Sequence, residues 1–155
     1  GAAARAAACG LLAGDPARVT LLVRRPEAIA ADVARLQELV PTAAVEIATL
    51  GCDEADHALA SADLVVQATP VGLADPAARP LAMPDQAPRA AGFELNYGPR
   101  PTAFATAWRD AGRRCLDGRD LLAAQARLAL EIWCGDAPPL AELRDLLDAP
   151  PEAAR

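Results

Sequence analysis

The chain has 155 residues, a length typical of one domain, and its composition excludes several classes of protein. With 21 acidic and 15 basic residues its net charge is -6, so we expect no nucleic-acid partner, because phosphate binding needs a clustered basic surface. No apolar run is long enough to span a membrane, and the first residues lack the pattern of a secretory signal peptide. All of the basic residues are arginines, so a lysine of this chain cannot act in catalysis.

The cysteines and the single histidine do not form a metal-binding pattern. Cys9, Cys52, Cys115 and Cys134 are widely separated, no CxxC pair occurs, and His57 is the only imidazole. We therefore expect no metal, and thiols that stay reduced in the cytoplasm.

Helices and strands alternate along the first half of the chain. The opening residues 1–13 read as a helix that stops at Gly14-Asp15-Pro16. The apolar run VTLLV at 19–23 predicts a strand buried on both faces, followed by a helix over 26–39 that starts with proline. Further elements are expected at 45–50 (strand), 53–61 (helix) and 63–69 (strand).

The second half adds one strand and three helices. A proline-rich loop over 75–88 precedes a weak strand at 92–95, and helices are expected over 102–111, 121–133 and 140–147. The alternation predicts an α/β fold, a Rossmann-like doubly wound parallel sheet with helices on both faces and extra C-terminal helices. We expect one domain over 1–149 and a frayed tail over 150–155.

Ligands of such sheets bind beyond the carboxyl ends of the strands. Gly1, Ala2 and Ala3 open a helix with small residues, which suits a pyrophosphate but is also common in ordinary helices. Arg24 and Arg25 follow the first predicted strand, where arginine accommodates the 2′-phosphate of NADP; solvated surface arginines are the alternative.

Three further polar residues sit after strands or on a helix. Thr69 precedes a Pro-Val-Gly turn, and Tyr97 follows the weak strand at 92–95. Gln125 belongs to the helix that follows the turn at Gly118. These side chains could hydrogen-bond a small polar ligand, or be an ordinary turn residue, a core tyrosine and an exposed glutamine.

The order of these segments resembles the C-terminal, NADP-binding half of the shikimate dehydrogenases. The family patterns GxGG(A/S)xR, NRT, NATPxGM, DxxYxPxxT and DGxxMLxxQ have partial counterparts here in the same order. Those counterparts are GAAAR, VRR, QATPVGL, ELNYGPRPT and DGRDLLAAQ.

The resemblance implies roles for ten residues. Those that match cofactor-binding positions are Gly1, Ala2, Ala3, Arg24, Arg25, Thr69, Leu95 and Gly118. Tyr97 and Gln125 match substrate-binding positions. The implied cofactor is NADP, with NAD as an alternative because Arg25 replaces the threonine of NRT. The implied partner is the small molecule shikimate or 3-dehydroshikimate. We expect no membrane partner, because no apolar run is long enough, and a homodimer is a possible assembly.

The resemblance also implies that this is part of a longer enzyme of chorismate and aromatic amino acid biosynthesis. In the family, the catalytic lysine and aspartate belong to an N-terminal substrate domain, which is absent here, as is the first strand of the nucleotide domain. This chain therefore has no expected catalytic residue. Val23, Gln67 and Glu94 depart from the family pattern, which leaves a dehydrogenase for quinate or another small hydroxy acid as one alternative. The absent N-terminal half leaves a non-catalytic nucleotide-binding module as the other.

Overall fold

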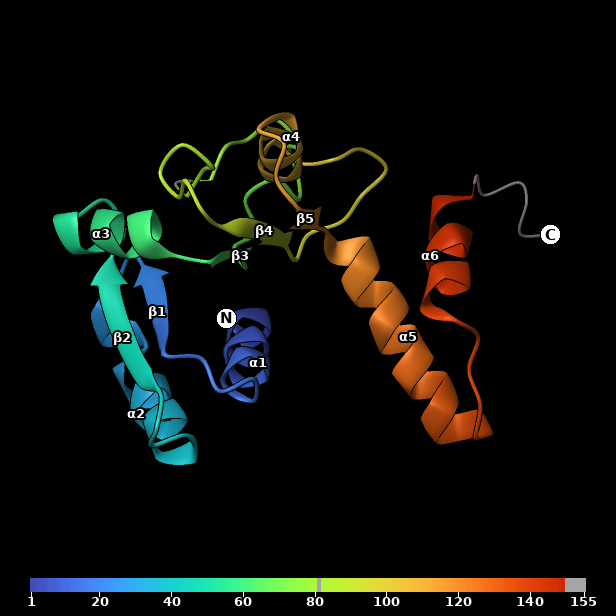
Figure 1. Ribbon diagram of the computed structural model, residues 1–155, viewed down its shortest axis with the longest axis horizontal. Coiled ribbons are helices and arrows are strands. Elements are labelled where there is room, and N and C mark those ends of the chain that lie inside the picture. Colours follow the sequence, from blue (N-terminus) through green and yellow to red (C-terminus); the bar gives the residue numbers. More distant parts are fainter. Residues whose placement is uncertain (81, 150–155) are drawn as a thin grey trace.

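The computed structural model describes residues 1–80 and 82–149, which form an α/β fold (Figure 1). The predicted tail 150–155 and Leu81 of the predicted loop lie outside the described residues. The elements in chain order are α1 (Ala2–Leu12), β1 (Arg18–Val23), η1 (Pro26–Ala28), α2 (Ala30–Leu39), β2 (Ala44–Thr49), α3 (Asp53–Ser61), β3 (Leu64–Gln67), β4 (Ala91–Glu94), α4 (Ala103–Asp110), β5 (Cys115–Leu116), α5 (Gly118–Cys134) and α6 (Leu140–Asp148).

All described strand pairs are parallel, as the sequence predicts, but they form two sheets instead of one. In the first sheet β1 pairs with β2, from Arg18 opposite Ala44 to Val23 opposite Thr49. The second sheet has the order β3-β4-β5. Within the described residues no strand bridges β1 and β3, so each keeps one edge without a partner. The expected single sheet is divided for this reason.

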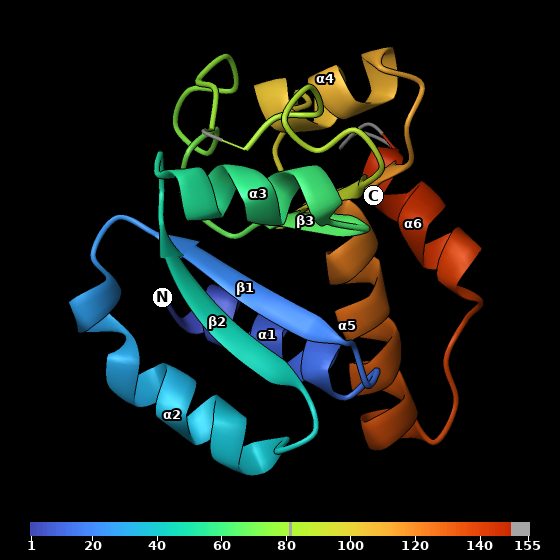
Figure 2. The same ribbon diagram turned by 60° about the vertical axis from the view of Figure 1, so that its left-hand side comes forward.

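Helices cover both faces of the strands, which confirms the doubly wound arrangement (Figure 2). On one side, α1 and α2 pack with β1 in a cluster that includes Leu12, Val19 and Leu36. On the other side, α3 and α4 pack with β3 in a cluster that includes Leu59, Val65, Phe104 and Trp108. Neighbouring side chains of β1 reach both clusters, because Leu21 contacts the first and Leu22 the second.

The run at 19–23 is less buried than the sequence predicts. Val19 is buried, but Leu21, Leu22 and Val23 are only partly buried. A strand that lacks a neighbour on one edge leaves part of its side chains accessible, which explains the difference.

Several predicted boundaries were wrong, each for a local reason. The helix expected over 26–39 is a 3₁₀ turn followed by α2, because the backbone leaves the helical conformation at Ile29 (φ −122°). The strand expected over 63–69 ends at Gln67, whose side chain accepts a hydrogen bond from Thr69 N at 3.3 Å and turns the chain. The short strand β5 was not predicted, since two residues carry no periodicity.

The helix expected from residue 121 begins at Gly118. The Asp117 carboxylate caps it by accepting from Arg119 N at 3.0 Å, and Asp120 accepts from Asp117 N at 2.7 Å. The α5–α6 pair extends away from the body of the molecule (Figure 1). None of the described helices is both long and apolar enough to cross a membrane.

Candidate functional site

The predicted pyrophosphate and 2′-phosphate residues lie at the carboxyl-end edge of the first sheet. Figure 1 shows the start of α1 on the same side as the arrowheads of β1 and β2. Gly1, Ala2 and Ala3 are exposed there, and the first turn of α1 holds neither an acidic residue nor a side-chain cap. The first N–H groups of this 11-residue helix are therefore accessible to an anion.

Arg24 and Arg25 directly follow β1 and are both exposed. Neither forms an ion pair with another described residue, whereas Arg5 at the start of α1 is paired with Asp32 of α2 at 3.1 Å. Two unpaired guanidinium groups at the same sheet edge as the N-terminus of α1 add positive charge to this edge of a chain whose net charge is -6. This edge is thus suited to a phosphorylated ligand.

The turn after β3 and the turn after β4 are bound to each other. Asn96 Nδ2 donates to the carbonyl oxygens of Thr69 and Val71, both at 2.9 Å. The Thr69 hydroxyl accepts from Val71 N at 3.3 Å and is exposed at the tip of its turn. The structure therefore brings the predicted cofactor residue Thr69 close to the segment that carries the predicted substrate residue Tyr97.

Glu94 is a buried carboxylate beneath these two turns, with 1% of its surface exposed. Its Oε1 accepts from Asn96 N and its Oε2 from the Thr102 hydroxyl, both at 2.9 Å. Thr102 Oγ1 in turn accepts from Ala105 N at 3.2 Å and so caps α4. Burial raises the pKa of Glu94, and the hydrogen bonds from Asn96 and Thr102 offset only part of that effect.

Leu95 and Gly118 meet where the second sheet joins α5. Gly118 N donates to Asn96 O at 3.2 Å. A Cβ atom on Gly118 would lie 2.5 Å from Leu95 O and 2.7 Å from Asn96 O, which is too close for any side chain. Gly118 thus allows the backbones of α5 and the β4 turn to touch.

A pocket of about 110 Å³ opens beside these residues. Glu94, Asn96, Tyr97 and Thr102 line one side of it. Tyr97 is 54% exposed, so it is an accessible phenol and not the core tyrosine of the alternative reading. Besides Glu94, the charged part of the lining consists of Arg100, Arg109, Asp117, Arg119 and Arg144.

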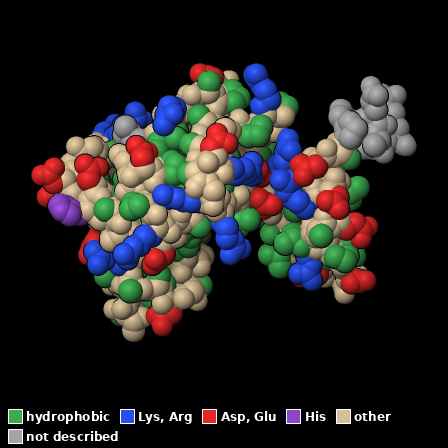
Figure 3. All heavy atoms as spheres, turned by 45° about the horizontal axis from the view of Figure 1, so that its top comes forward, with side chains coloured by type: hydrophobic (Ala, Val, Ile, Leu, Met, Phe, Trp, Pro, Cys, Tyr) green, Lys and Arg blue, Asp and Glu red, His purple; other side chains and the backbone are tan. Residues whose placement is uncertain are grey.

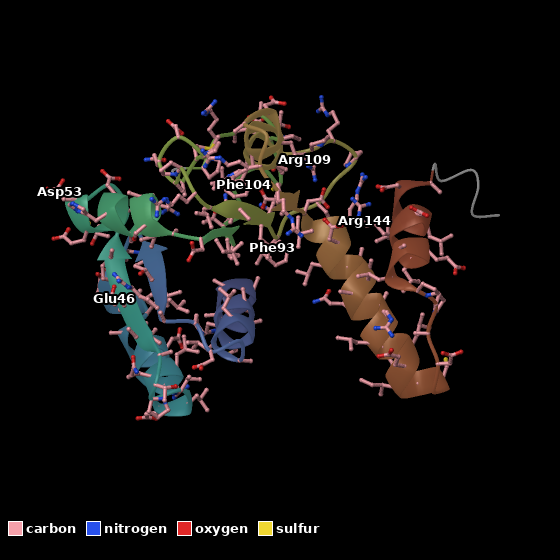
Figure 4. The ribbon with its side chains drawn as sticks, viewed as in Figure 1. Glu46, Asp53, Phe93, Phe104, Arg109 and Arg144 are labelled. Carbon is pink, nitrogen blue, oxygen red and sulfur yellow. The ribbon has the colours of Figure 1, made fainter. Side chains whose placement is uncertain are left out.

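An arginine–aspartate network joins three helices at this pocket. Arg109 of α4 contacts Asp117 at 2.8 Å, and Arg144 of α6 contacts Asp120 at 2.9 Å, so both arginines approach the start of α5 (Figure 4). Arg119 donates to Gly98 O at 2.6 Å and so holds the segment next to Tyr97. Basic and acidic side chains consequently lie intermingled between the body and the α5–α6 pair (Figure 3).

The network keeps its groups ionised. Burial alone would raise the pKa of Asp117, but hydrogen bonds from Arg109 and Arg119 N outweigh it and lower the pKa below the ordinary value. The hydrogen bond to Asp148 raises the pKa of Arg144 still further above its usual range. Burial raises the pKa of the nearby Cys115 thiol to about 11, which favours the protonated thiol over the thiolate.

The structure does not bring Gln125 to this pocket. Gln125 is exposed two turns into α5 and is not among the residues that line the pocket. Within 1–80 and 82–149, no group of three or more His, Cys, Asp or Glu side chains could hold a metal ion.

Sequence reasoning missed Asn96 and the arginines of the network. The pattern ELNYGPRPT draws attention to Tyr97, whereas the partners of Asn96 lie 27 and 25 residues earlier in the chain. The Asp117-x-x-Asp120 spacing was a visible capping signal for the earlier start of α5, although aspartate is a less usual residue than glutamate at its second position.

Comparisons with known proteins point to one group of enzymes. No protein-family model matches the chain. It is 36% identical over 149 residues to the NADP-dependent shikimate dehydrogenase of Symbiobacterium thermophilum, with 93% of this chain and 50% of that protein covered. The NADP-dependent shikimate dehydrogenase of Bacillus licheniformis is 30% identical over 148 residues, which cover 95% of this chain and 51% of that protein. The chain therefore spans about half the length of the curated relatives it matches.

Solved structures show the same fold. The ligand-free 5-ketofructose reductase of a Gluconobacter strain superposes with a TM-score of 0.82 at 24% identity, covering 96% of this chain and 53% of that one. Quinate dehydrogenase of Corynebacterium glutamicum in complex with NAD superposes with a TM-score of 0.78 at 22% identity, covering 94% of this chain and 51% of that one. Shikimate dehydrogenase of Mycobacterium tuberculosis superposes with a TM-score of 0.73 at 24% identity, covering 94% of this chain and 52% of that one.

Proposed function

We propose that this chain, which corresponds to the C-terminal half of the shikimate dehydrogenases in sequence and fold, is the nucleotide-binding part of such an enzyme. The complete protein would reduce 3-dehydroshikimate to shikimate with NADPH, a step toward chorismate and the aromatic amino acids. One observation carries the proposal: the similarity to NADP-dependent shikimate dehydrogenases extends over 93–95% of the chain. Residues 1–149 would form the nucleotide-binding domain.

The residues at the edge of the first sheet fit an NADP molecule. Arg24 and Arg25 form no ion pair with a described carboxylate, so both guanidinium groups can pair with the 2′-phosphate. Gly1, Ala2 and Ala3 would present the N–H groups of α1 to the pyrophosphate. The bound nicotinamide would supply the hydride.

The second sheet would hold the reacting end of the complex. Thr69, Leu95 and Gly118 lie on connected turns beside the pocket, and we assign them to the nicotinamide side. Tyr97 faces solvent at the rim, where its hydroxyl can bond the substrate from this side. Gln125 lies outside the pocket, and it is assigned to the substrate from the resemblance alone.

The other half of the enzyme would supply the proton-transfer groups. This chain contains no lysine, and the resemblance assigns that role to a lysine and an aspartate of an N-terminal domain. An apolar face on α5 supports a covering domain, because Leu128 and Ile132, four residues apart on this helix, are 57% and 80% exposed. A cytoplasmic location belongs to the same proposal, since all four cysteines are free thiols. A homodimer stays a prediction.

The test is turnover by the natural polypeptide that contains these residues. Purified protein is mixed with 3-dehydroshikimate and NADPH, and loss of NADPH absorbance is followed against a reaction without substrate. We expect steady reduction, with kcat/KM above about 10⁴ M⁻¹s⁻¹, the lower end for natural enzymes. Absence of turnover, by protein that melts cooperatively and binds NADPH, would overturn the proposal.

A quinate or related hydroxy-acid dehydrogenase is the second candidate. Arg25 stands where the NADP-specific pattern has threonine. Val23, Gln67 and Glu94 also depart from the shikimate dehydrogenase pattern. Comparing kcat/KM for shikimate, quinate and 5-ketofructose with both cofactors decides between the two. Higher kcat/KM on quinate or 5-ketofructose than on shikimate would replace the first assignment.

A further inference from the structure

The turns after β3 and β4 are connected by one amide side chain. Asn96 is the only asparagine in the chain, and its Nδ2 atom donates both hydrogens to main-chain oxygens of the other turn, those of Thr69 and Val71. We propose that Asn96 is a positioning residue that fixes the Thr69 turn against Tyr97, so that cofactor and substrate meet in register. This inference rests on the proposed function, which assigns Thr69 to the cofactor and Tyr97 to the substrate.

The two hydrogen bonds of Asn96 determine where the Thr69 turn lies. Both are 2.9 Å long, and they bind carbonyl groups on either side of Pro70, so the turn is held at two points. A single bond would let the turn rotate about it, whereas two bonds fix its orientation.

A buried platform fixes Asn96 itself. Its backbone N–H donates to Glu94, whose second oxygen accepts from the Thr102 hydroxyl. Its backbone carbonyl accepts from Gly118 N at the start of α5. The Thr102 side chain also touches the Thr69 turn, since a Cβ on Gly72 would lie 3.1 Å from Thr102 Cγ2. Asn96 is thus anchored on both backbone atoms, and the turn it holds rests on Thr102.

The geometry gives Asn96 a role distinct from general stability. Tyr97 is the next residue in the chain and is not itself constrained by a hydrogen bond of its own among the described contacts. Its position is therefore set by its two neighbours: Gly98, whose carbonyl oxygen accepts from Arg119, and Asn96, whose bridge alone among the described hydrogen bonds ties this segment to the Thr69 turn by a side chain. Hydride transfer needs reacting atoms in near-attack geometry, and misplacement by about 1 Å can lower the rate roughly 100-fold.

The test is Asn96→Asp in the natural polypeptide. The carboxylate has the shape of the amide but would face two carbonyl oxygens with no hydrogen to donate. We expect KM to rise for both NADPH and 3-dehydroshikimate, kcat to fall, and kcat/KM to drop roughly 10- to 100-fold. Amide hydrogen exchange in residues 69–73 should accelerate, because Leu73 N and Val71 N belong to the released turn.

Gln37→Glu is the matched control. The Gln37 amide joins the end of α2 to the start of β2 by donating to Ala43 O at 2.8 Å and accepting from Val45 N at 3.0 Å. This substitution also removes an amide that joins two backbone segments, but away from the pocket. We expect it to lower Tm while KM and kcat stay unchanged.

Two outcomes would overturn the inference. The first is an Asn96→Asp enzyme whose KM values are unchanged and whose kcat falls only as much as its folded fraction does. The second is unchanged amide hydrogen exchange in residues 69–73 of that variant. If Asn96→Asp fails to fold, Asn96→Ser keeps one donor and should give intermediate KM values. Failure of the proposed function can be told apart from failure of this inference, because it would show as an inactive wild-type enzyme. In that case amide exchange and NADPH affinity would still test the Asn96 bridge.

Discussion

The two sheets end in regions of opposite character. At the end of β1 the arginines at 24 and 25 extend into solvent without ionic partners in the described chain. At the ends of β3 and β4, in contrast, the polar groups are bonded to one another: Glu94 to Thr102, Asn96 to Thr69, and Arg119 to Gly98.

The difference is what the two halves of a bound dinucleotide would require. A phosphate gains most from cations that are not already neutralised by the protein, so its site is left unpaired. A reacting nicotinamide ring and its substrate need fixed positions relative to each other, so the site that would hold them is preorganised by hydrogen bonds within the protein. The end of β1, the unpaired region, is therefore expected to tolerate structural change but to be sensitive to loss of charge. The ends of β3 and β4, the bonded region, are expected to be sensitive to structural change and to tolerate loss of charge.

The largest effect is expected from Gly118→Ala, at the centre of the bonded region. Its Cβ would collide with two backbone oxygens, which cannot move aside as a flexible side chain would. We expect the free energy of unfolding to fall by about 3 kcal/mol, the upper part of the range for overpacking. Chemical denaturation of the natural polypeptide measures it.

Gly10→Ala is the control for that substitution. Gly10 lies inside α1, and a Cβ there would have no atom within 4 Å. Alanine should raise the free energy of unfolding by about 0.5–1 kcal/mol through helix propensity. If both substitutions behaved alike, close packing would not be the reason for glycine at 118.

Removing the charges of the unpaired region should change cofactor choice and not stability. Arg24→Ala with Arg25→Ala should lower the preference for NADPH over NADH about 10- to 100-fold, because charge-assisted hydrogen bonds contribute about 1.5–3 kcal/mol. The preference is measured as the ratio of kcat/KM for the two cofactors. The control Arg35→Ala with Arg79→Ala removes two exposed arginines elsewhere, and an equal loss there would refute the assignment.

Glu94 tests how the bonded region responds to pH. Because burial raises its pKa in the folded chain, its ionisation costs more in the folded than in the unfolded state. Its contribution to stability is therefore intact below the ordinary carboxyl pKa of about 4.3 and is lost as the pH rises through the raised folded value. Asp117, with its lowered pKa, acts oppositely and loses stability as the pH falls.

Glu94→Gln should thus gain stability relative to the wild type as the pH rises from about 4 to about 8. Glu94→Ala should lose about 1–3 kcal/mol, because it leaves the Thr102 hydroxyl and Asn96 N without an acceptor. Thermal melts at several pH values measure both. A wild-type to Gln difference that is constant with pH would contradict the raised pKa of Glu94.

This contrast between the regions also explains what the sequence could predict. The run at 19–23 and the arginines after it are local signals, so β1 and its accessible cations follow from a few adjacent residues. The Asn96 bridge and the Arg144–Asp120 contact join residues 24–27 positions apart, and no local pattern marks such pairs. β5 is likewise defined only by its pairing, Gly92 with Cys115 and Phe93 with Leu116.

The smallest effect is expected from Arg144→Ala, at the margin of the bonded region. Arg144 fixes α6 to the start of α5 through Asp117 and Asp120, and it also pairs with Asp148 within α6. Exposed pairs contribute about 0.2–1 kcal/mol each and are screened by salt, so the loss should be about 1 kcal/mol and should shrink at high ionic strength. Faster amide exchange confined to α6 would show that the network docks this helix. Arg127→Ala breaks only an i,i+4 pair within α5, so amide exchange in α6 should stay unchanged in this control. If Arg144→Ala also left the exchange of α6 unchanged, α6 would be held by its apolar face instead.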